Sequence, residues 1–153
     1  MADSAIYPQA PPLTEDEITE LLQTADIARL ATHNEDGSIH VAPLYFVYEA
    51  PDILLGTQSM SQKVRNIARD PRVTVLVDVT APALVGAVVY GTAELDHQDV
   101  VAKRATIFRR YMPDDAADAF AHRLADTWEP VVIRVRPDRV VSFDYRKGFP
   151  TFD

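Results

Sequence analysis

The sequence predicts a mainly β domain of the α+β class, in which antiparallel strands close into a barrel and helices pack outside it. About seven segments rich in β-branched and aromatic residues are bounded by turn residues, as is typical of short strands. Short turns join most of them, which favours antiparallel pairing. Gly86 and Gly91 fall inside one long strand, where glycines permit the bending that a barrel requires. The expected strands are 27–32, 39–48, 53–55, 73–79, 84–95, 129–135 and 140–145.

Helices are expected in four places around this barrel. Thr14 and Glu17 form a capping box, which predicts a helix through about residue 23. Further helices are expected from about residue 60, after a Ser59 cap, to residue 70, at 97–111 after an Asp96 cap, and at 114–127. We expect residues 1–13 to be a flexible, proline-containing arm, residues 14–147 a single domain, and residues 148–153 a tail.

Composition excludes several classes of function. The chain has 153 residues, a net charge of −8 and no cysteine. The negative charge argues against a nucleic acid or an anionic membrane surface as partner. Without cysteine there is no thiol catalysis and no thiolate metal site. No apolar run approaches the roughly 20 residues of a membrane span, and the start lacks a signal-peptide pattern, so we expect a cytoplasmic protein.

The segment from Gly56 to Pro71 has the pattern of a phosphate-binding helix start. A short apolar strand leads to Ser59, a good N-cap, and Gln62 completes a capping-box pattern. The first helical turn would offer free N–H groups, serine hydroxyls and Lys63, which together favour an anion. An ordinary capped surface helix has the same pattern, so this segment alone leaves both interpretations open.

The expected strand 39–48 is apolar on both faces and carries Pro43 in its middle. Proline cannot donate to a sheet ladder and is usually found on an edge strand or at a bulge. An edge strand that is apolar on both faces needs a cover, and we expect either another subunit or a flat ligand to provide it.

Catalytic side chains are not evident. The four histidines are scattered without metal-ligand spacing, and there is no serine hydrolase motif. Arg109 and Arg110 are interpreted as a solvated helix face. The catalytic residues therefore stay unknown, no metal site is expected, and in an enzyme a cofactor would carry the chemistry.

Several segments together resemble the flavin/deazaflavin split-barrel superfamily, which includes pyridoxamine 5′-phosphate oxidase. The resemblance covers about residues 14–147, and its motifs are Ile27-Ala-Arg-Leu-Ala-Thr-His, Asp36-Gly-Ser-Ile-His-Val-Ala-Pro-Leu-Tyr-Phe-Val, Ser61-Gln-Lys-Val-Arg-Asn-Ile-Ala-Arg-Asp-Pro-Arg-Val, Val89-Tyr-Gly-Thr-Ala-Glu and Arg136-Pro-Asp-Arg-Val-Val-Ser-Phe-Asp. It implies a split β-barrel of the FMN-binding type and a homodimer with cofactor sites at the subunit interface.

The resemblance also implies which residues bind the cofactor. The ring would lie along the proline-containing strand, and the phosphate would lie at the strand-to-helix segment. The ring residues are Val41, Ala42, Pro43 and Leu44; the phosphate residues are Thr57, Ser59, Ser61, Gln62 and Lys63, with Asn66 supporting the helix start.

Departures from the oxidase pattern favour coenzyme F420 over FMN. The FMN oxidases have an arginine and a lysine at positions that match His40 and Tyr45, and an Arg-Lys pair where this chain has Gln62-Lys63. The spacing of Ser61, Lys63 and Asn66 instead resembles the F420-dependent reductase branch.

Three hypotheses follow from this resemblance. The first is an F420-dependent reductase that passes hydride to a conjugated or heteroaromatic small molecule. The second is an FMN-binding oxidase or flavin reductase. The third is a non-catalytic protein that holds haem, another tetrapyrrole or the deazaflavin on the same fold.

Overall fold

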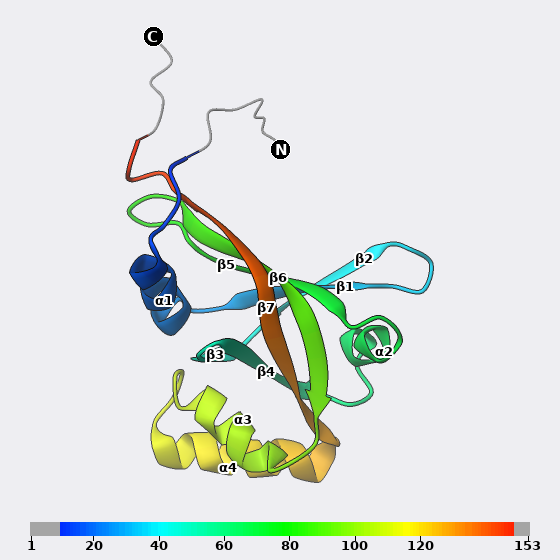
Figure 1. The fold of residues 1–153 in the computed structure, drawn as a ribbon. Helices are drawn as coiled ribbons and strands as arrows, with labels where there is room; N and C mark the ends of the chain where they lie inside the picture. Colours follow the sequence, from blue (N-terminus) through cyan, green and yellow to red (C-terminus); the bar gives the residue numbers. More distant parts are fainter. Residues whose placement is uncertain (1–9, 149–153) are drawn as a thin grey trace.

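The computed structural model describes residues 10–148, which fold around a single seven-stranded antiparallel sheet (Figure 1). The strand order is β2-β1-β5-β6-β7-β4-β3. The sheet curls into a split barrel with helices outside, which confirms the predicted fold class. In chain order the elements are α1 (Glu15–Thr24), β1 (Ala28–His33), β2 (Ile39–Leu44), β3 (Phe46–Glu49), β4 (Asp52–Gln58), α2 (Gln62–Arg69), β5 (Arg72–Val79), β6 (Val85–Asp96), α3 (Val100–Phe108), α4 (Asp114–Thr127) and β7 (Pro130–Asp144).

The segment predicted as one strand, 39–48, is two strands at opposite edges of the sheet. β2 pairs with β1 and β3 pairs with β4, and only Tyr45 lies between them. The prediction of a single strand was wrong because an unbroken apolar alternation does not reveal a change of pairing partner. Since one residue joins the two edges, the sheet has to curl until they meet there.

Near the end of the chain, the two strands predicted at 129–135 and 140–145 are a single strand, β7. β7 continues through Pro137, and its register against β6 shifts between Tyr90 and Gly91. Asp138 is the extra residue on β7, so this is a β-bulge, a place where a strand tolerates proline. A Cβ on Gly91 would lie 2.3 Å from the Arg136 carbonyl oxygen, so the bulge requires glycine here.

Apolar side chains from adjacent strands fill the barrel. Leu30, Val75 and Val89 are direct neighbours across β1, β5 and β6, and all three are fully buried. Burying each such side chain contributes about 1.5–3 kcal/mol. The core continues through β3, β4 and β7 with Phe46, Ile53, Leu55, Ile133 and Val135.

The helices lie outside this core, with α3 and α4 forming a pair across one end of the sheet (Figure 1). The Thr14–Glu17 capping box opens α1 as predicted. The expected helix at 97–111 is shorter, because α3 begins after Asp99, which has a left-handed φ of 50°. Asp96 is not its cap: its carboxylate accepts from the Gln98 N–H at 2.9 Å and from Lys103 Nζ at 2.7 Å.

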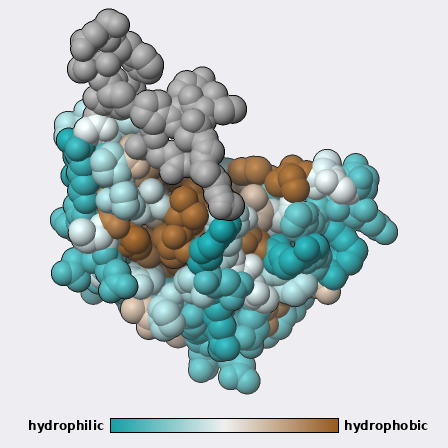
Figure 2. All heavy atoms as spheres, turned by 45° about the horizontal axis from the view of Figure 1, so that its top comes forward, coloured by the Kyte–Doolittle hydropathy of each residue, from teal (hydrophilic) through white to brown (hydrophobic). Residues whose placement is uncertain are grey.

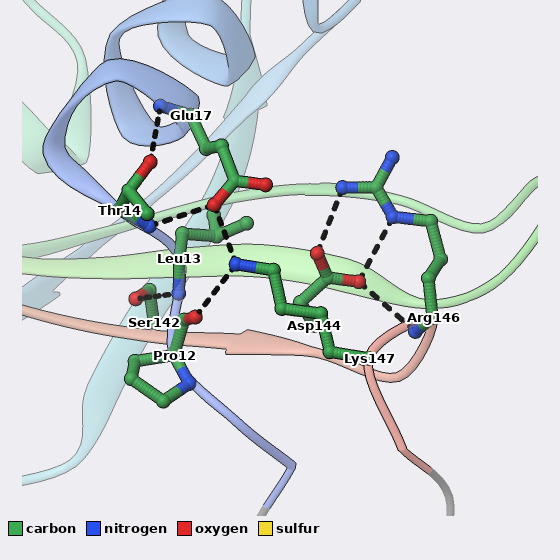
Figure 3. A network of polar contacts seen from close by, with 8 residues as sticks. All are labelled: Pro12, Leu13, Thr14, Glu17, Ser142, Asp144, Arg146 and Lys147. Atoms are coloured by element: carbon green, nitrogen blue, oxygen red, sulfur yellow. Dashed lines mark hydrogen bonds and ion pairs between the residues drawn. The ribbon is translucent and has the colours of Figure 1, made fainter.

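The predicted arm, 1–13, and tail, 148–153, lie mostly outside the described residues. Where they are described, the two ends of the chain are joined by polar contacts (Figure 3). Leu13 is buried, and its N–H donates to Ser142 Oγ at 2.9 Å. Lys147 Nζ contacts both Glu17 and the Pro12 carbonyl. The buried carboxylate of Asp144 accepts three hydrogen bonds from Arg146.

This network predicts how stability depends on pH. The hydrogen bond from Lys147 and the capping bonds at Thr14 lower the pKa of Glu17 from 4.5 to about 2. A lowered pKa in the folded state means that Glu17 stabilises the fold above pH 4.5, and that this contribution is lost as the pH falls toward 2. In Lys147→Met we expect the pKa of Glu17 to rise toward 4.5, measured by NMR titration. An unchanged Glu17 pKa in this variant would contradict the assignment.

Candidate functional site

The start of α2 differs in detail from the predicted phosphate seat. The N-cap is Ser61, not Ser59, and the Ser61 side chain makes no capping hydrogen bond. Ser59 continues the β4–β7 pairing: its N–H donates to the Glu129 carbonyl at 2.9 Å, and its hydroxyl donates to the Glu129 carboxylate at 3.1 Å. The prediction of Ser59 as the cap was wrong because the strand ladder extends further than the sequence pattern indicates.

Gln62 does not form the predicted capping box, because its side chain is hydrogen-bonded to other side chains of α2. Its amide nitrogen donates to Asn66 Oδ1 at 2.8 Å, and its oxygen accepts from Arg65 Nη2 at 2.9 Å. Arg65 Nη1 also donates to the Met60 carbonyl at 2.9 Å. Arg65 therefore folds back and places a second positive charge beside the helix start, which the sequence analysis did not foresee.

Lys63 is the free cation of this segment. It is partly buried, and burial lowers the pKa of its ammonium group. Within residues 10–148 no hydrogen bond or ion pair engages it. The first backbone bond of this turn is donated by Val64 to Ser61, so the N–H groups of Gln62 and Lys63 precede it. Ser61 Oγ lies 3.5 Å from Thr57 Oγ1, which brings these two predicted hydroxyls together.

Asn66 joins α2 to the first hairpin. Its side chain is fully buried, and its Nδ2 donates to Thr32 Oγ1 at 3.0 Å and to Asn34 Oδ1 at 2.8 Å. Because Gln62 and Arg69 donate to its oxygen, both ends of the amide are satisfied inside the protein. Asn66 therefore fixes the helix start that carries Lys63.

A cavity of about 430 Å³ lies beside the junction of β2 and β3. Pro43 and Leu44 of the predicted ring strand line it, together with Gly56 and Gln58, which flank Thr57. The cavity thus joins the ring strand to the strand that leads into α2. The remaining lining comes from Tyr45 and from mostly apolar residues of α3, α4 and the segment before β1: Ile27, Arg104, Ile107, Phe108, Phe120 and Leu124.

Arg104 is a functional candidate that the sequence analysis missed. It is only 3 % exposed, and its Nε and Nη1 have no hydrogen-bond partner among residues 10–148. Burial lowers the pKa of its guanidinium group. The signal was present in the sequence, since Arg104 is one helical turn from Val100 and Phe108 and so falls on the apolar face of α3.

Arg110 was predicted to be solvated, and that prediction was wrong. Its guanidinium donates to the carbonyls of Phe46 at 2.6 Å, Ala25 at 2.8 Å and Gln23 at 3.0 Å, and it lies 4.6 Å from the centre of the Phe46 ring. Arg110 therefore joins α3 to β3 and to the end of α1. Its neighbour Arg109 does lie at the surface, paired with Asp118.

The other predicted ring residues lie on the edge strand, as expected from Pro43. Val41 is 59 % exposed, and it shares a row with Ala31, Thr74 and Tyr90 on neighbouring strands. Ala42 is partly buried and pairs with Leu30. A space-filling view shows hydrophobic surface gathered in two places among hydrophilic surroundings (Figure 2). On the sheet face that carries Val41, the apolar side chains of Ile39, Val41 and Tyr90 are exposed within the described residues.

Residues 10–148 contain no group of three or more side chains that could together bind a metal ion. None of the helices in this range is long and apolar enough to cross a membrane.

Comparison with known proteins identifies the family. The family model for pyridoxamine 5′-phosphate oxidase matches residues 14–142. The chain belongs to this family. No curated protein gives a significant match. Among solved structures, the conserved hypothetical protein Rv2991 from Mycobacterium tuberculosis is 26 % identical with a TM-score of 0.80, covering 100 % of this chain and 96 % of that one.

Two further structures share the fold. An F420 reductase is 23 % identical with a TM-score of 0.67, covering 83 % of this chain and 98 % of that one. A FAD-binding protein from Mesorhizobium loti is 25 % identical with a TM-score of 0.62, covering 87 % of this chain and 96 % of that one. Proteins named for two different cofactors therefore share this fold.

The position of Asn66 yields a stability prediction. In Asn66→Ala, the hydroxyl of Thr32 and the amide of Asn34 lose a buried partner, so we expect the free energy of unfolding to fall by about 1–3 kcal/mol. Urea denaturation measures this change. Asn34→Ala is the matched control: Asn34 is only partly buried and makes just one of the hydrogen bonds of Asn66, so its loss should cost less. Equal losses in the two variants would contradict the role given to Asn66.

Proposed function

We propose that this protein is a reductase that uses reduced coenzyme F420 and transfers hydride to a conjugated or heteroaromatic small molecule. The observation that carries the proposal is the ammonium of Lys63 at the start of α2, which is partly buried and has no polar partner within residues 10–148. A partly buried cation without a partner loses some of its hydration, and a phosphodiester beside free helical N–H groups would compensate that loss. The shared fold with an F420 reductase supports the choice of cofactor.

The residues present fit such a group at the start of α2. Lys63 would hold the phosphodiester, with the hydroxyls of Ser61 and Thr57 as further donors. Arg65 adds positive charge on the same side of the chain, beside Met60 and Gln62. The backbone of Val41 to Leu44 would fix the ring, at the strand where Pro43 leaves the ladder incomplete.

In this scheme the cofactor, when bound, supplies the hydride. The chain would contribute binding and orientation: Lys63 would anchor one end of the cofactor, and the mostly apolar side chains of the cavity would hold the acceptor against it. No side chain of the cavity is assigned as proton donor, and water would serve. Catalysis would come mainly from positioning.

FMN is the second candidate, and the FAD-binding relative is the observation that favours it. The positions that match the phosphate-binding arginine and lysine of the oxidases are His40 and Tyr45. Tyr45 is stacked on Tyr111, with ring centres 4.0 Å apart, so it is held by packing. His40 Nδ1 is buried without a partner. These residues supply less positive charge than FMN receives in the oxidases, and we therefore favour F420.

The active unit in this proposal is a homodimer. The sheet face that carries Val41 would pack against a second copy, placing the edge strand and its cofactor ring at the subunit interface. The exposed apolar side chains Ile39, Val41 and Tyr90 support this arrangement, because their burial would favour association.

Replacement of Lys63 tests the cofactor site. In Lys63→Ala we expect F420 binding to weaken by about 1–3 kcal/mol, the loss of a charge-assisted hydrogen bond. Fluorescence titration with F420, and separately with FMN, measures it. Lys63→Arg keeps the charge and should retain most of the affinity, and Arg123→Ala removes an exposed charge elsewhere and should retain all of it.

Three outcomes of this titration are decisive. Unchanged F420 affinity in Lys63→Ala would contradict the assignment of Lys63 as the residue that binds the cofactor's phosphodiester. If the wild-type protein binds FMN more tightly than F420, it is a flavin enzyme and not an F420-dependent reductase. Binding of F420 or of haem without turnover of any acceptor would make it a cofactor-holding protein on the same fold.

Replacement of Val41 tests the dimer. Val41→Asp places a carboxylate in the centre of the proposed interface, so we expect the dimer to dissociate to monomers at micromolar concentration. Light scattering after size-exclusion chromatography measures the mass. Ala116→Asp, at an exposed position of α4, adds the same charge outside the interface and should stay dimeric. A monomeric wild-type protein would overturn this arrangement.

A further inference from the structure

The cavity contains a buried positive charge that nothing in the described chain neutralises. Arg104 is 3 % exposed, and its Nε and Nη1 make no hydrogen bond. Its guanidinium lies over the Phe108 ring, whose centre is 5.5 Å from the guanidinium carbon. A cation–π contact replaces only part of the hydration that the guanidinium loses. Such a group is stable in a protein when an anion completes it.

Packing holds the guanidinium at the wall of the cavity. A Cβ on Gly56 would lie only 3.1 Å from Arg104 Nε and 3.3 Å from its Cγ, so the stem of Arg104 lies directly against β4. Glycine at position 56 therefore leaves room for this arginine. Among the described residues, the lining of the cavity includes no aspartate or glutamate that could pair with it.

Arg104 differs in this respect from the neighbouring arginines. Arg110 is satisfied by three backbone carbonyls, and Arg109 is paired with Asp118. Both are fixed by the protein itself and have structural roles. Arg104 lies on α3, before these two arginines, and its Nε and Nη1 have no partner in the described chain, as is typical of a residue that binds a ligand.

The rest of the cavity is suited to an apolar body. Ile27, Pro43, Phe108, Phe120 and Leu124 line it, and its volume of about 430 Å³ is in the range of small-molecule sites. A guanidinium presents a planar fork of donors that matches a carboxylate or phosphate. The cavity therefore combines an apolar enclosure with a single buried cation.

We infer that this cavity binds the acceptor of the reaction, and that the acceptor is an apolar, aromatic molecule with a carboxylate or phosphate group held by Arg104. The identification of the ligand as the acceptor rests on the proposed function. The oxyanion site itself does not, because it follows from the burial and the free donors of Arg104. Substrates without an anionic group would leave this charge unpaired and would bind weakly.

The first experiment measures binding without any cofactor. The full-length protein is titrated with 2-naphthoate and with its neutral analogue 2-naphthamide, followed by ligand fluorescence. We expect the carboxylate to bind at least about tenfold more tightly than the amide. Equal binding of the two, or no binding of either, would overturn the inference.

Variants then locate the binding site. Arg104→Met should lose at least about tenfold in naphthoate affinity and leave naphthamide affinity unchanged. Arg104→Lys should retain part of the preference. Arg123→Met is the matched control: it removes an exposed arginine from α4 that also lies over a phenylalanine ring, at 5.6 Å from Phe120, and it should bind naphthoate as the wild type does.

The same variant gives an independent readout of the unpaired charge. Without ligand, Arg104→Met should melt at a higher temperature than the wild type, because an apolar side chain replaces a buried cation that lacks a partner. If Arg104→Met does not fold, Gly56→Ala tests the role of Arg104 in binding. The new Cβ would push against Arg104, so we expect weaker naphthoate binding although all charges are retained. A lower melting temperature for a folded Arg104→Met would indicate that the protein itself satisfies the arginine and would contradict the inference.

Competition separates this inference from the proposed function. Naphthoate and F420 should bind together, since the acceptor and the cofactor occupy adjacent sites; mutual exclusion would assign Arg104 to the cofactor and overturn the acceptor site. If naphthoate binds but F420 does not, the oxyanion site stands and the proposed function fails. If F420 binds through Lys63 but naphthoate does not bind, the function stands and this inference fails.

Discussion

The passage from β2 to β3 through one residue constrains the whole structure. Leu44 ends a strand at one edge of the sheet, and Phe46 begins a strand at the other edge, so Tyr45 marks the place where the two edges approach each other. The barrel can form only if the long strands β6 and β7 curl, and the bulge at Gly91 and Pro137 lies in that pair. The cavity lies beside this same junction, since Pro43, Leu44 and Tyr45 all line it.

Polar side chains that have hydrogen-bond partners in the protein can be distinguished from those that lack them, and the first group is structural whereas the second is suited to binding a ligand. Asn66 and Arg110 are each satisfied by several protein partners, and each joins segments that are distant in sequence. Lys63 and Arg104 are at least partly desolvated and have no polar partner in residues 10–148. A folded chain tolerates such groups where a ligand completes them. The two cations lie at the start of α2 and in the cavity, and they would hold two different anions.

Most of the fold could be predicted from the sequence, because its elements depend on local patterns. The Thr14–Glu17 capping box, the helix end before Pro71 and the alternation of β5 all depend on residues that are close in the chain. The errors occurred where distant pairing decides the structure. The hydroxyl of Ser59 is hydrogen-bonded to Glu129, 70 residues away, so it does not cap α2. Pro137 fits within β7 because the strand forms a bulge opposite Gly91.

The candidate site was predictable in part for the same reason. The sequence by itself determined the class of fold, the family and the segment that carries Lys63, since these are recorded in short motifs and in periodicity. Only the tertiary structure decided that Arg65 folds back to the start of α2, that Arg110 is fixed by carbonyls of α1 and β3, and that Arg104 is enclosed without a partner. A charged side chain has the same appearance in a sequence whether it is solvated, paired or buried. Its surroundings come from residues far along the chain, and they are fixed only when the sheet curls and the helices pack against it.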